Sequence, residues 1–185
     1  MNIPNFLTIA RILLIPVMVI FLLDGELVSA FWVFVAAGVT DGLDGFLARV
    51  LHQQTEFGAF IDPIADKLLL LTAYVSLAAL GFLPKWLAVV VVSRDVLICG
   101  GIGVLMLYNR SFVIRPSLVS KMTTLLQLLT VAFHLGQQYL EGVLGYRHAL
   151  ILLTAAFTLI SGAHYLARGF RILGSPEEAT RSGIE

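Results

Sequence analysis

The feature that most constrains this chain is a series of six long apolar stretches. They cover roughly residues 5–23, 28–51, 59–81, 86–108, 117–137 and 147–171. A helix that crosses a bilayer needs about 20 mostly apolar residues, because the hydrocarbon is about 30 Å thick and each residue rises about 1.5 Å. The short alternating segments of a membrane barrel are not seen. Since helices satisfy their own backbone in lipid, the sequence predicts an all-α integral membrane protein with six transmembrane helices.

Composition supports this class and excludes others. Of the 185 residues, 58% are hydrophobic and 13% are charged, whereas a soluble domain carries about 25% charged residues. Lys plus Arg and Asp plus Glu number 12 each, so the formal net charge is zero. This balance argues against a nucleic-acid partner. The length fits a single domain over 1–185, in which we expect the polar residues 174–185 to form a flexible tail.

The distribution of positive charge predicts the orientation in the membrane. Most Lys and Arg residues lie near the N-terminus, the second and fourth connections, or the C-terminus: Arg11, Arg49, Arg110, Arg115, Lys121, Arg168, Arg171 and Arg181. The opposite side carries Lys85 and Arg147. The positive-inside rule therefore places both termini in the cytoplasm, as for a protein of a bacterial inner membrane or its equivalent.

Four aspartates lie in or beside the second and third apolar stretches. Asp41 and Asp44 are three residues apart, and Asp62 and Asp66 are four apart, so each pair shares a helix face. One Asp at the centre of a membrane helix costs about 2.5–3.5 kcal/mol on insertion scales. Two antiparallel helices joined by a short turn would aim all four carboxylates into one polar cleft that faces the cytoplasm.

Such a cluster needs a positive counter-charge, because four carboxylates cannot all stay ionised in a low dielectric. Mg²⁺ or Mn²⁺ suits an all-carboxylate site, and two such ions stabilise the entering and leaving oxygens of a phosphoryl displacement. Arg49 is placed to bind a phosphate. The small residues Gly45, Ala48 and Gly58 leave room for a bulky ligand near the backbone.

Other interpretations of the acids remain. Helix-end aspartates are often solvated or paired with a nearby Lys or Arg. Intramembrane acids also line ion pathways, so a divalent-cation transporter is the alternative of another class. It would need a polar path beyond the cluster, yet the far half of each stretch is almost wholly apolar. A scaffold without catalytic activity is a third interpretation.

The segment resembles a known family, the CDP-alcohol phosphatidyltransferases. Their signature, D-x2-D-G-x2-A-R-x8-G-x3-D-x3-D, is met at every fixed position: Asp41, Asp44, Gly45, Ala48, Arg49, Gly58, Asp62 and Asp66. The six-helix pattern carries the likeness over nearly the whole chain. This resemblance implies an enzyme that transfers the phosphatidyl group of a CDP-linked lipid, usually CDP-diacylglycerol, to an alcohol and releases CMP.

The resemblance also implies roles for single residues. The four aspartates, Asp41, Asp44, Asp62 and Asp66, would hold two metal ions. Asp66 would also act as the general base that takes the proton of the acceptor hydroxyl. The cytidine and diphosphate would be accommodated by Gly45, Ala48, Arg49 and Gly58. The resemblance further implies a homodimer in contact with membrane lipid.

The start of the chain bears on the acceptor alcohol. Asn2-Ile3-Pro4-Asn5, followed by Thr8 and Arg11, is similar to the opening of family members that use glycerol-type acceptors. Asn5 and Arg11 are candidates for the nucleotide site. The alternative is that Pro4 and Asn5 only begin a helix.

A second segment favours one acceptor. Ser93-Arg94-Asp95 and Ser120-Lys121 look more like cardiolipin synthases, and Ile102 stands where enzymes that use glycerol 3-phosphate often carry another arginine. We therefore favour phosphatidylglycerol as acceptor, with glycerol 3-phosphate as the alternative. Arg94 either forms a structural pair with Asp95 or belongs to an anion pocket. The candidate residues for that pocket are Arg94, Arg115, Lys121, Arg168 and Arg171.

Two further expectations concern single side chains. Cys99, the only cysteine, lies in an apolar stretch and is expected to be a small buried residue. His134 lies near the end of the fifth stretch and is expected at the membrane–water boundary.

Overall fold

A computed structural model describes the backbone of residues 3–50, 56–107, 118–139 and 145–173, and the side chains of 6–42, 64–101, 118–139 and 145–169. Within these ranges the regular structure is helical. The elements are α1 (Ile3–Leu23), α2 (Leu27–Val50), α3 (Glu56–Ala79), α4 (Lys85–Leu107), α5 (Leu118–Leu135), the 3₁₀-helix η1 (Gln137–Tyr139) and α6 (Arg147–Leu173). The all-helical prediction is confirmed, and each predicted end lies within three residues of an observed one.

Three helices are long and apolar enough to cross a membrane within the described residues. They are α1, α5 and α6, over Phe6–Leu23, Leu118–Leu135 and Arg147–Gly169. The apolar part of α2, Leu27–Gly42, is shorter. Helix α4 carries Lys85 at its start and Arg94 and Asp95 near its middle. That all six helices span the bilayer stays a prediction.

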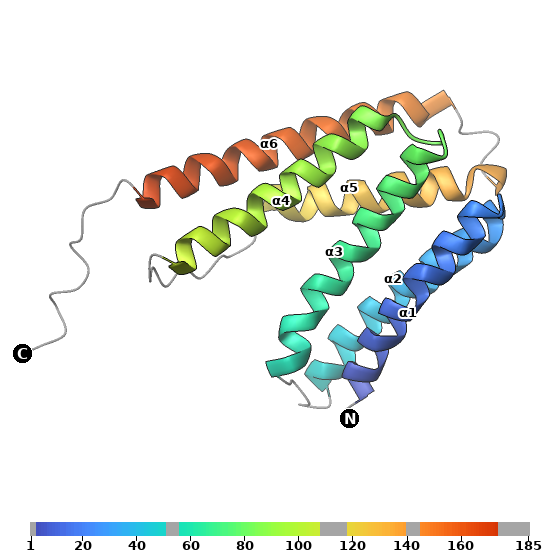
Figure 1. Cartoon of the computed structure of the whole chain (residues 1–185), viewed down its shortest axis with the longest axis horizontal. Helices are drawn as coiled ribbons and strands as arrows, with labels where there is room; N and C mark the ends of the chain where they lie inside the picture. Colours follow the sequence, from blue (N-terminus) through green and yellow to red (C-terminus); the bar gives the residue numbers. More distant parts are fainter. Residues whose placement is uncertain (1–2, 51–55, 108–117, 140–144, 174–185) are drawn as a thin grey trace, which may run out of the picture.

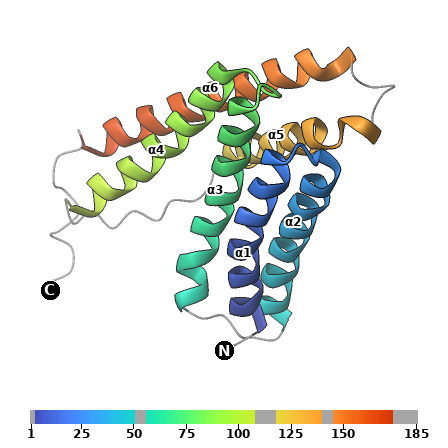
Figure 2. The same ribbon diagram turned by 45° about the vertical axis from the view of Figure 1, so that its right-hand side comes forward.

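The helices form two groups of three. Helix α1 packs against α2 and α3, and α6 packs against α4 and α5. Figures 1 and 2 show α1, α2 and α3 side by side, with α4 and α6 leaning away from them. The groups meet through α3 with α4 and through α5 with α2 and α3. The start of α1 lies at the same end as the end of α2 and the start of α3 (Figure 1).

Glycines end α1 and α3 in the same way. Gly25 and Gly81 have φ values of 79° and 83°, a left-handed conformation that disfavours a Cβ. At each end, the residue after the glycine donates to the carbonyl five positions back, over 2.8 Å for both Glu26 to Phe21 and Phe82 to Leu77. These hydrogen bonds satisfy backbone carbonyls that have no partner within the helix at its C-terminal end. The turns predicted at Asp24–Glu26 and Gly81–Lys85 are confirmed.

Each helix of the first group buries a stripe of side chains, and a charged residue lies at or near one end of each stripe among the described side chains. In α1 the buried positions are Thr8, Arg11, Ile15, Met18 and Leu22. In α2 they are Leu27, Ala30, Phe34 and Ala37, and Asp41 follows at the same spacing. In α3, Asp66 precedes Leu70, Ala73 and Leu77. Steps of three and four residues keep each set on one helix face. The packing therefore brings the three charged residues together.

Candidate functional site

Arg11 binds two of the four predicted metal ligands at once. Its Nη1 lies 2.8 Å from Oδ1 of Asp66, and its Nη2 lies 3.1 Å from Oδ1 of Asp41. The Arg11 side chain is fully buried, whereas both aspartate side chains are 43% exposed. One positive charge is therefore shared by two carboxylates from different helices, at the boundary between the packed interior and an open side.

The remaining signature residues lie close to this pair along the chain. Asp44 is one turn after Asp41 on α2, and Asp62 is one turn before Asp66 on α3. Their side chains lie outside the described residues, and so do those of the predicted CDP-binding residues Gly45, Ala48, Arg49 and Gly58 and of Asn5 on α1. The structure thus shows the first and last aspartates of the signature brought together, and the roles of the others stay predictions.

The donor set suits a hard divalent cation. Among the residues with described side chains, no group of three or more His, Cys, Asp and Glu lies close enough to hold a metal ion. Asp41 and Asp66 nevertheless converge on one positive group, as two ligands of a common cation must. Carboxylate oxygens are the ligands that Mg²⁺ and Mn²⁺ prefer. Asp41 and Asp66 therefore fit the predicted site, and Asp44 and Asp62 stay predicted ligands.

Arg94 links the three helices of the second group. It lies on α4 and donates from Nη1 to Oδ1 of Asp95 over 2.6 Å. Its Nη2 donates to the hydroxyls of Ser120 on α5 and Ser161 on α6, over 2.8 and 2.9 Å. The guanidinium carbon also lies 5.9 Å from the ring centroid of Tyr165, within cation–π range. These contacts match the structural-pair alternative for Arg94 and Asp95.

The other residues of the predicted anion pocket are more exposed or lie outside the described side chains. Lys121 directly follows Ser120 on α5 and is exposed, as is Arg168 near the end of α6. Arg115 lies outside the described ranges, and Arg171 lies on α6 without a described side chain. The pocket therefore stays a prediction.

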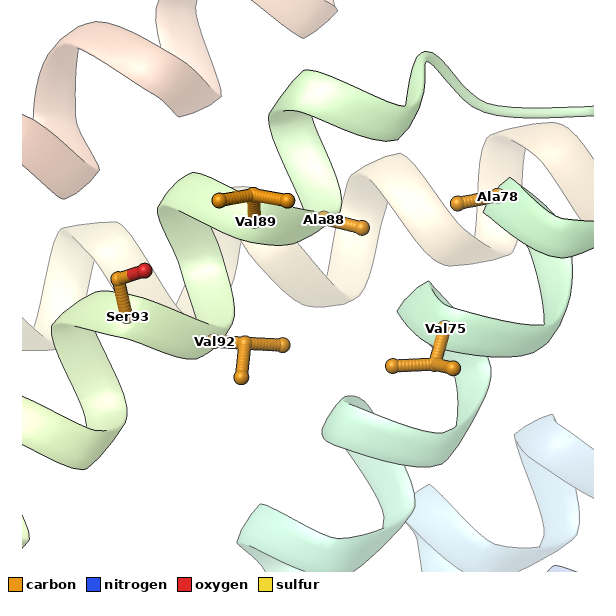
Figure 3. Close-up of a pocket in the computed structure, with 6 residues that line it drawn as sticks. All are labelled: Val75, Ala78, Ala88, Val89, Val92 and Ser93. Carbon is orange, nitrogen blue, oxygen red and sulfur yellow. The ribbon is translucent and has the colours of Figure 1, made fainter.

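A separate pocket lies between α3 and α4. Its volume is about 330 Å³, and its lining residues are Val75, Ala78, Ala88, Val89, Val92 and Ser93. Figure 3 shows the side chains of Val75 and Val92 extending into the space between the two helices. The lining has no charged side chain to bind a diphosphate. This pocket is therefore distinct from the site at Arg11, Asp41 and Asp66.

Comparison with known proteins assigns the family. The family model described as CDP-alcohol phosphatidyltransferase matches residues 1–160, which include the complete signature. The chain belongs to the CDP-alcohol phosphatidyltransferase family. The resemblance noted in the sequence is thereby confirmed, and the class of enzyme follows from the family.

Relatives within the family carry two kinds of name. The chain is 38% identical to a probable phosphatidylglycerophosphate synthase of Mycobacterium tuberculosis over 94% of its own length and 84% of that protein. It is 31% identical to the CDP-diacylglycerol–glycerol-3-phosphate 3-phosphatidyltransferase of Bacillus subtilis, over 93% and 97%. It is also 32% identical to human cardiolipin synthase (CMP-forming), over 91% and 62%. These names support both glycerol-type acceptors.

Buried polar side chains form a continuous line between α5 and α6, here called the polar seam, and this seam was not predicted from the sequence. It consists of buried polar residues at helical spacing: Thr123, Gln127, Thr130 and His134 on α5, and Thr154, Thr158 and Ser161 on α6. Thr130 and Thr154 share a hydrogen bond of 2.7 Å, and Gln127 Nε2 donates to Thr158 over 3.3 Å. Tyr74 of α3 donates to the Gln127 carbonyl over 3.2 Å. The polar residues on each helix are three or four positions apart in the sequence, and this spacing was the signal that could have revealed the seam.

His134 lies in the last turn of α5, and its place at the membrane–water boundary stays a prediction. Its side chain is 2% exposed, and its Nδ1 lies 2.7 Å from the carbonyl oxygen of Thr130. Arg147 at the start of α6 donates from Nε to His134 Nε2 over 3.1 Å and from Nη2 to the carbonyl of Phe82. His134 is therefore buried because Arg147 and the turn between α3 and α4 close over the end of α5.

The expectation for Cys99 is wrong. The residue is exposed on α4, and its sulfur accepts a hydrogen bond from Lys67 Nζ over 3.1 Å. Lys67 directly follows Asp66 on α3. An apolar stretch does not make each of its residues buried, because a helix in this group turns part of its apolar surface outward.

Proposed function

We propose that this protein transfers the phosphatidyl group of CDP-diacylglycerol to a glycerol-type alcohol and releases CMP, in the synthesis of anionic phospholipids. The family assignment supports the transfer and gives no support to the cation-transporter alternative. The observation that carries the proposal is the meeting of Asp41 and Asp66 at Arg11, because it joins the two ends of the signature in space.

The proposal assigns the four aspartates to a site for two divalent cations, Mg²⁺ or Mn²⁺. The ligands would be Asp41, Asp44, Asp62 and Asp66. When bound, the ions supply positive charge to the diphosphate and to the oxygen that leaves with CMP. Arg49 would bind a phosphate oxygen, and Gly45, Ala48 and Gly58 would let the nucleotide approach the backbone.

The reaction is a single displacement at phosphorus. The acceptor hydroxyl oxygen forms a bond to the lipid-bearing phosphorus, and the bond from that phosphorus to the oxygen of CMP breaks. CMP leaves with the electron pair. Asp66 takes the proton of the hydroxyl, which requires one of its oxygens within hydrogen-bond reach of the bound alcohol. Because Asp66 is 43% exposed, an alcohol can approach its carboxylate from the open side.

The acceptor that we favour is phosphatidylglycerol, which would make cardiolipin. The support comes from Ile102, because enzymes that use glycerol 3-phosphate often carry a second arginine at the corresponding position. A phosphodiester carries one negative charge and needs fewer cationic partners than a phosphomonoester. Glycerol 3-phosphate remains the second candidate, because relatives named for it align over nearly the whole chain.

We also propose that all six helices span the membrane with both termini in the cytoplasm, and that the chain forms a homodimer. The orientation rests on the Lys and Arg distribution. It is consistent with the start of α1 lying at the same end as the end of α2 and the start of α3 (Figure 1). The aspartate site would then open to the cytoplasm, where a nucleotide product can leave into water.

One assay tests the transfer and its acceptor together. Purified protein in detergent is given labelled CDP-diacylglycerol with phosphatidylglycerol, glycerol 3-phosphate, inositol phosphate or serine, in Mg²⁺, in Mn²⁺ or in EDTA. We expect CMP release with a glycerol-type acceptor and a metal, and none in EDTA. Cardiolipin as product supports the favoured acceptor, and phosphatidylglycerophosphate supports the second. No CMP release with any acceptor contradicts the proposed function.

A further inference from the structure

We infer that Arg11 is a positioning residue of the metal site: it holds one oxygen of Asp41 and one of Asp66 from the buried side, and so fixes where two partly exposed carboxylates lie relative to one another. The inference rests on the proposed function for the metal site. It gives Arg11 a part other than the nucleotide contact expected from the sequence.

The difference in burial carries the first step. Arg11 lies in the buried stripe of α1 with Ile15 and Met18, and no part of its side chain is exposed. Asp41 and Asp66 are both substantially exposed. The guanidinium therefore approaches the carboxylates from the interior of the helix group. A cation from solvent would approach them from the other side.

The shape of the guanidinium carries the second step. Each terminal nitrogen of Arg11 binds a different aspartate, one on α2 and one on α3. A planar fork fixes the separation and direction of two acceptors, whereas a lysine ammonium is a single point of charge on a flexible stem. Arg11 therefore sets the relative position of the two carboxylates as well as offsetting their charge.

The two possible effects of Arg11 on metal binding have opposite signs. If Arg11 acted only through its charge, its removal would strengthen cation binding, because a nearby positive charge repels a cation. If it positions the carboxylates, its removal weakens binding. Loss of a group that holds a ligating carboxylate typically costs 10- to 100-fold in metal affinity. We expect the second effect.

The test is an Mn²⁺ titration followed by electron paramagnetic resonance, in detergent and without nucleotide or lipid. The variants are Arg11→Met, Arg11→Lys, Asp41→Asn and Arg147→Met. Arg147→Met is the matched control, because Arg147 is a part-buried arginine that contacts His134 and Phe82 rather than an aspartate. Thermal unfolding and size exclusion of each variant report whether it folds.

We expect Mn²⁺ affinity to fall about tenfold or more in Arg11→Met and in Arg11→Lys, and to be unchanged in Arg147→Met. Unchanged or tighter binding in a folded Arg11→Met would overturn the inference while leaving the proposed function intact. If Arg11→Met does not fold, Arg11→Lys decides in the same way. If wild-type protein does not bind Mn²⁺, or if Asp41→Asn does not weaken that binding, the proposed metal site itself fails, and the inference fails with it.

Discussion

Asp41 of α2 and Asp66 of α3 bind the two terminal nitrogens of the same arginine. Their meeting point lies where three apolar stripes end, so the helices that bury Met18, Ala37 and Leu70 also set the spacing of the two carboxylates. The chemistry proposed for this protein and the packing of its first three helices therefore depend on one another. The predictions below separate the two.

Asp66→Asn tests the general base. The amide keeps the size of the side chain and can still accept a hydrogen bond from Arg11, but it cannot take a proton. We expect CMP release to fall at least about 100-fold while the protein still folds. The measurement is the rate of CMP release from CDP-diacylglycerol. Asp24→Asn is the control, because Asp24 is exposed in the turn between α1 and α2. Wild-type turnover in Asp66→Asn would rule out the assigned role.

The pair of Arg94 and Asp95 makes a prediction about stability. Arg94→Met leaves Asp95 buried without its guanidinium partner, and breaking a buried ion pair in this way costs about 3–5 kcal/mol. Arg94→Met combined with Asp95→Leu removes both charges, so we expect most of the loss to be recovered. Thermal unfolding in detergent gives the comparison. A double variant as unstable as the single one would show that the pair is not the main structural role of Arg94.

Thr130→Val tests the seam between α5 and α6. Valine keeps the shape of threonine but removes the 2.7 Å hydrogen bond to Thr154. Side-chain hydrogen bonds between membrane helices contribute about 0.6 kcal/mol on average and about 1.7 at most. We expect a loss of free energy of unfolding in that range, measured by titration with SDS. Thr124→Val is the control, because exposed Thr124 bonds only to the Ser120 carbonyl of its own helix among the described contacts. Equal losses in both variants would contradict an interhelical contribution.

Gly81→Ala tests the end of α3. The φ of 83° is unfavourable for any residue with a Cβ, although no heavy atom lies within 4 Å of where the Cβ would be. Backbone strain alone should then lower stability by about 1–2 kcal/mol. Gly38→Ala, on α2 with equally open space and no positive φ, should be neutral or stabilising by up to about 1 kcal/mol. The temperatures of unfolding of both variants check this, and a Gly81→Ala protein as stable as Gly38→Ala would count against the strained turn.

The elements of this fold could be predicted from the sequence because lipid imposes a length on each helix. The apolar stretches predicted helix ends within three residues of the observed ones. The turns at Gly25 and Gly81 follow because glycine tolerates a positive φ. Spacing within a helix also placed Asp41 with Asp44, and Asp62 with Asp66, on shared faces. These inferences need only the geometry of one helix.

Contacts between helices could not be predicted in the same way. Arg11 was expected at the nucleotide, since the sequence does not show which residue its side chain meets on another helix. Its place in the stripe with Ile15, Met18 and Leu22 was a usable signal for burial. Cys99 was placed wrongly for the same reason. Position along an apolar stretch gives depth in the membrane, whereas burial depends on which face the neighbouring helices cover.

The exposed thiol of Cys99 has a practical consequence for following motion in this protein. It is the only cysteine in the chain, so a spin label or a fluorophore attached there would mark one point of α4 with no prior mutagenesis. Because its sulfur contacts Lys67, the neighbour of Asp66, such a label would report on changes in local mobility and environment at the contact between α3 and α4 during turnover.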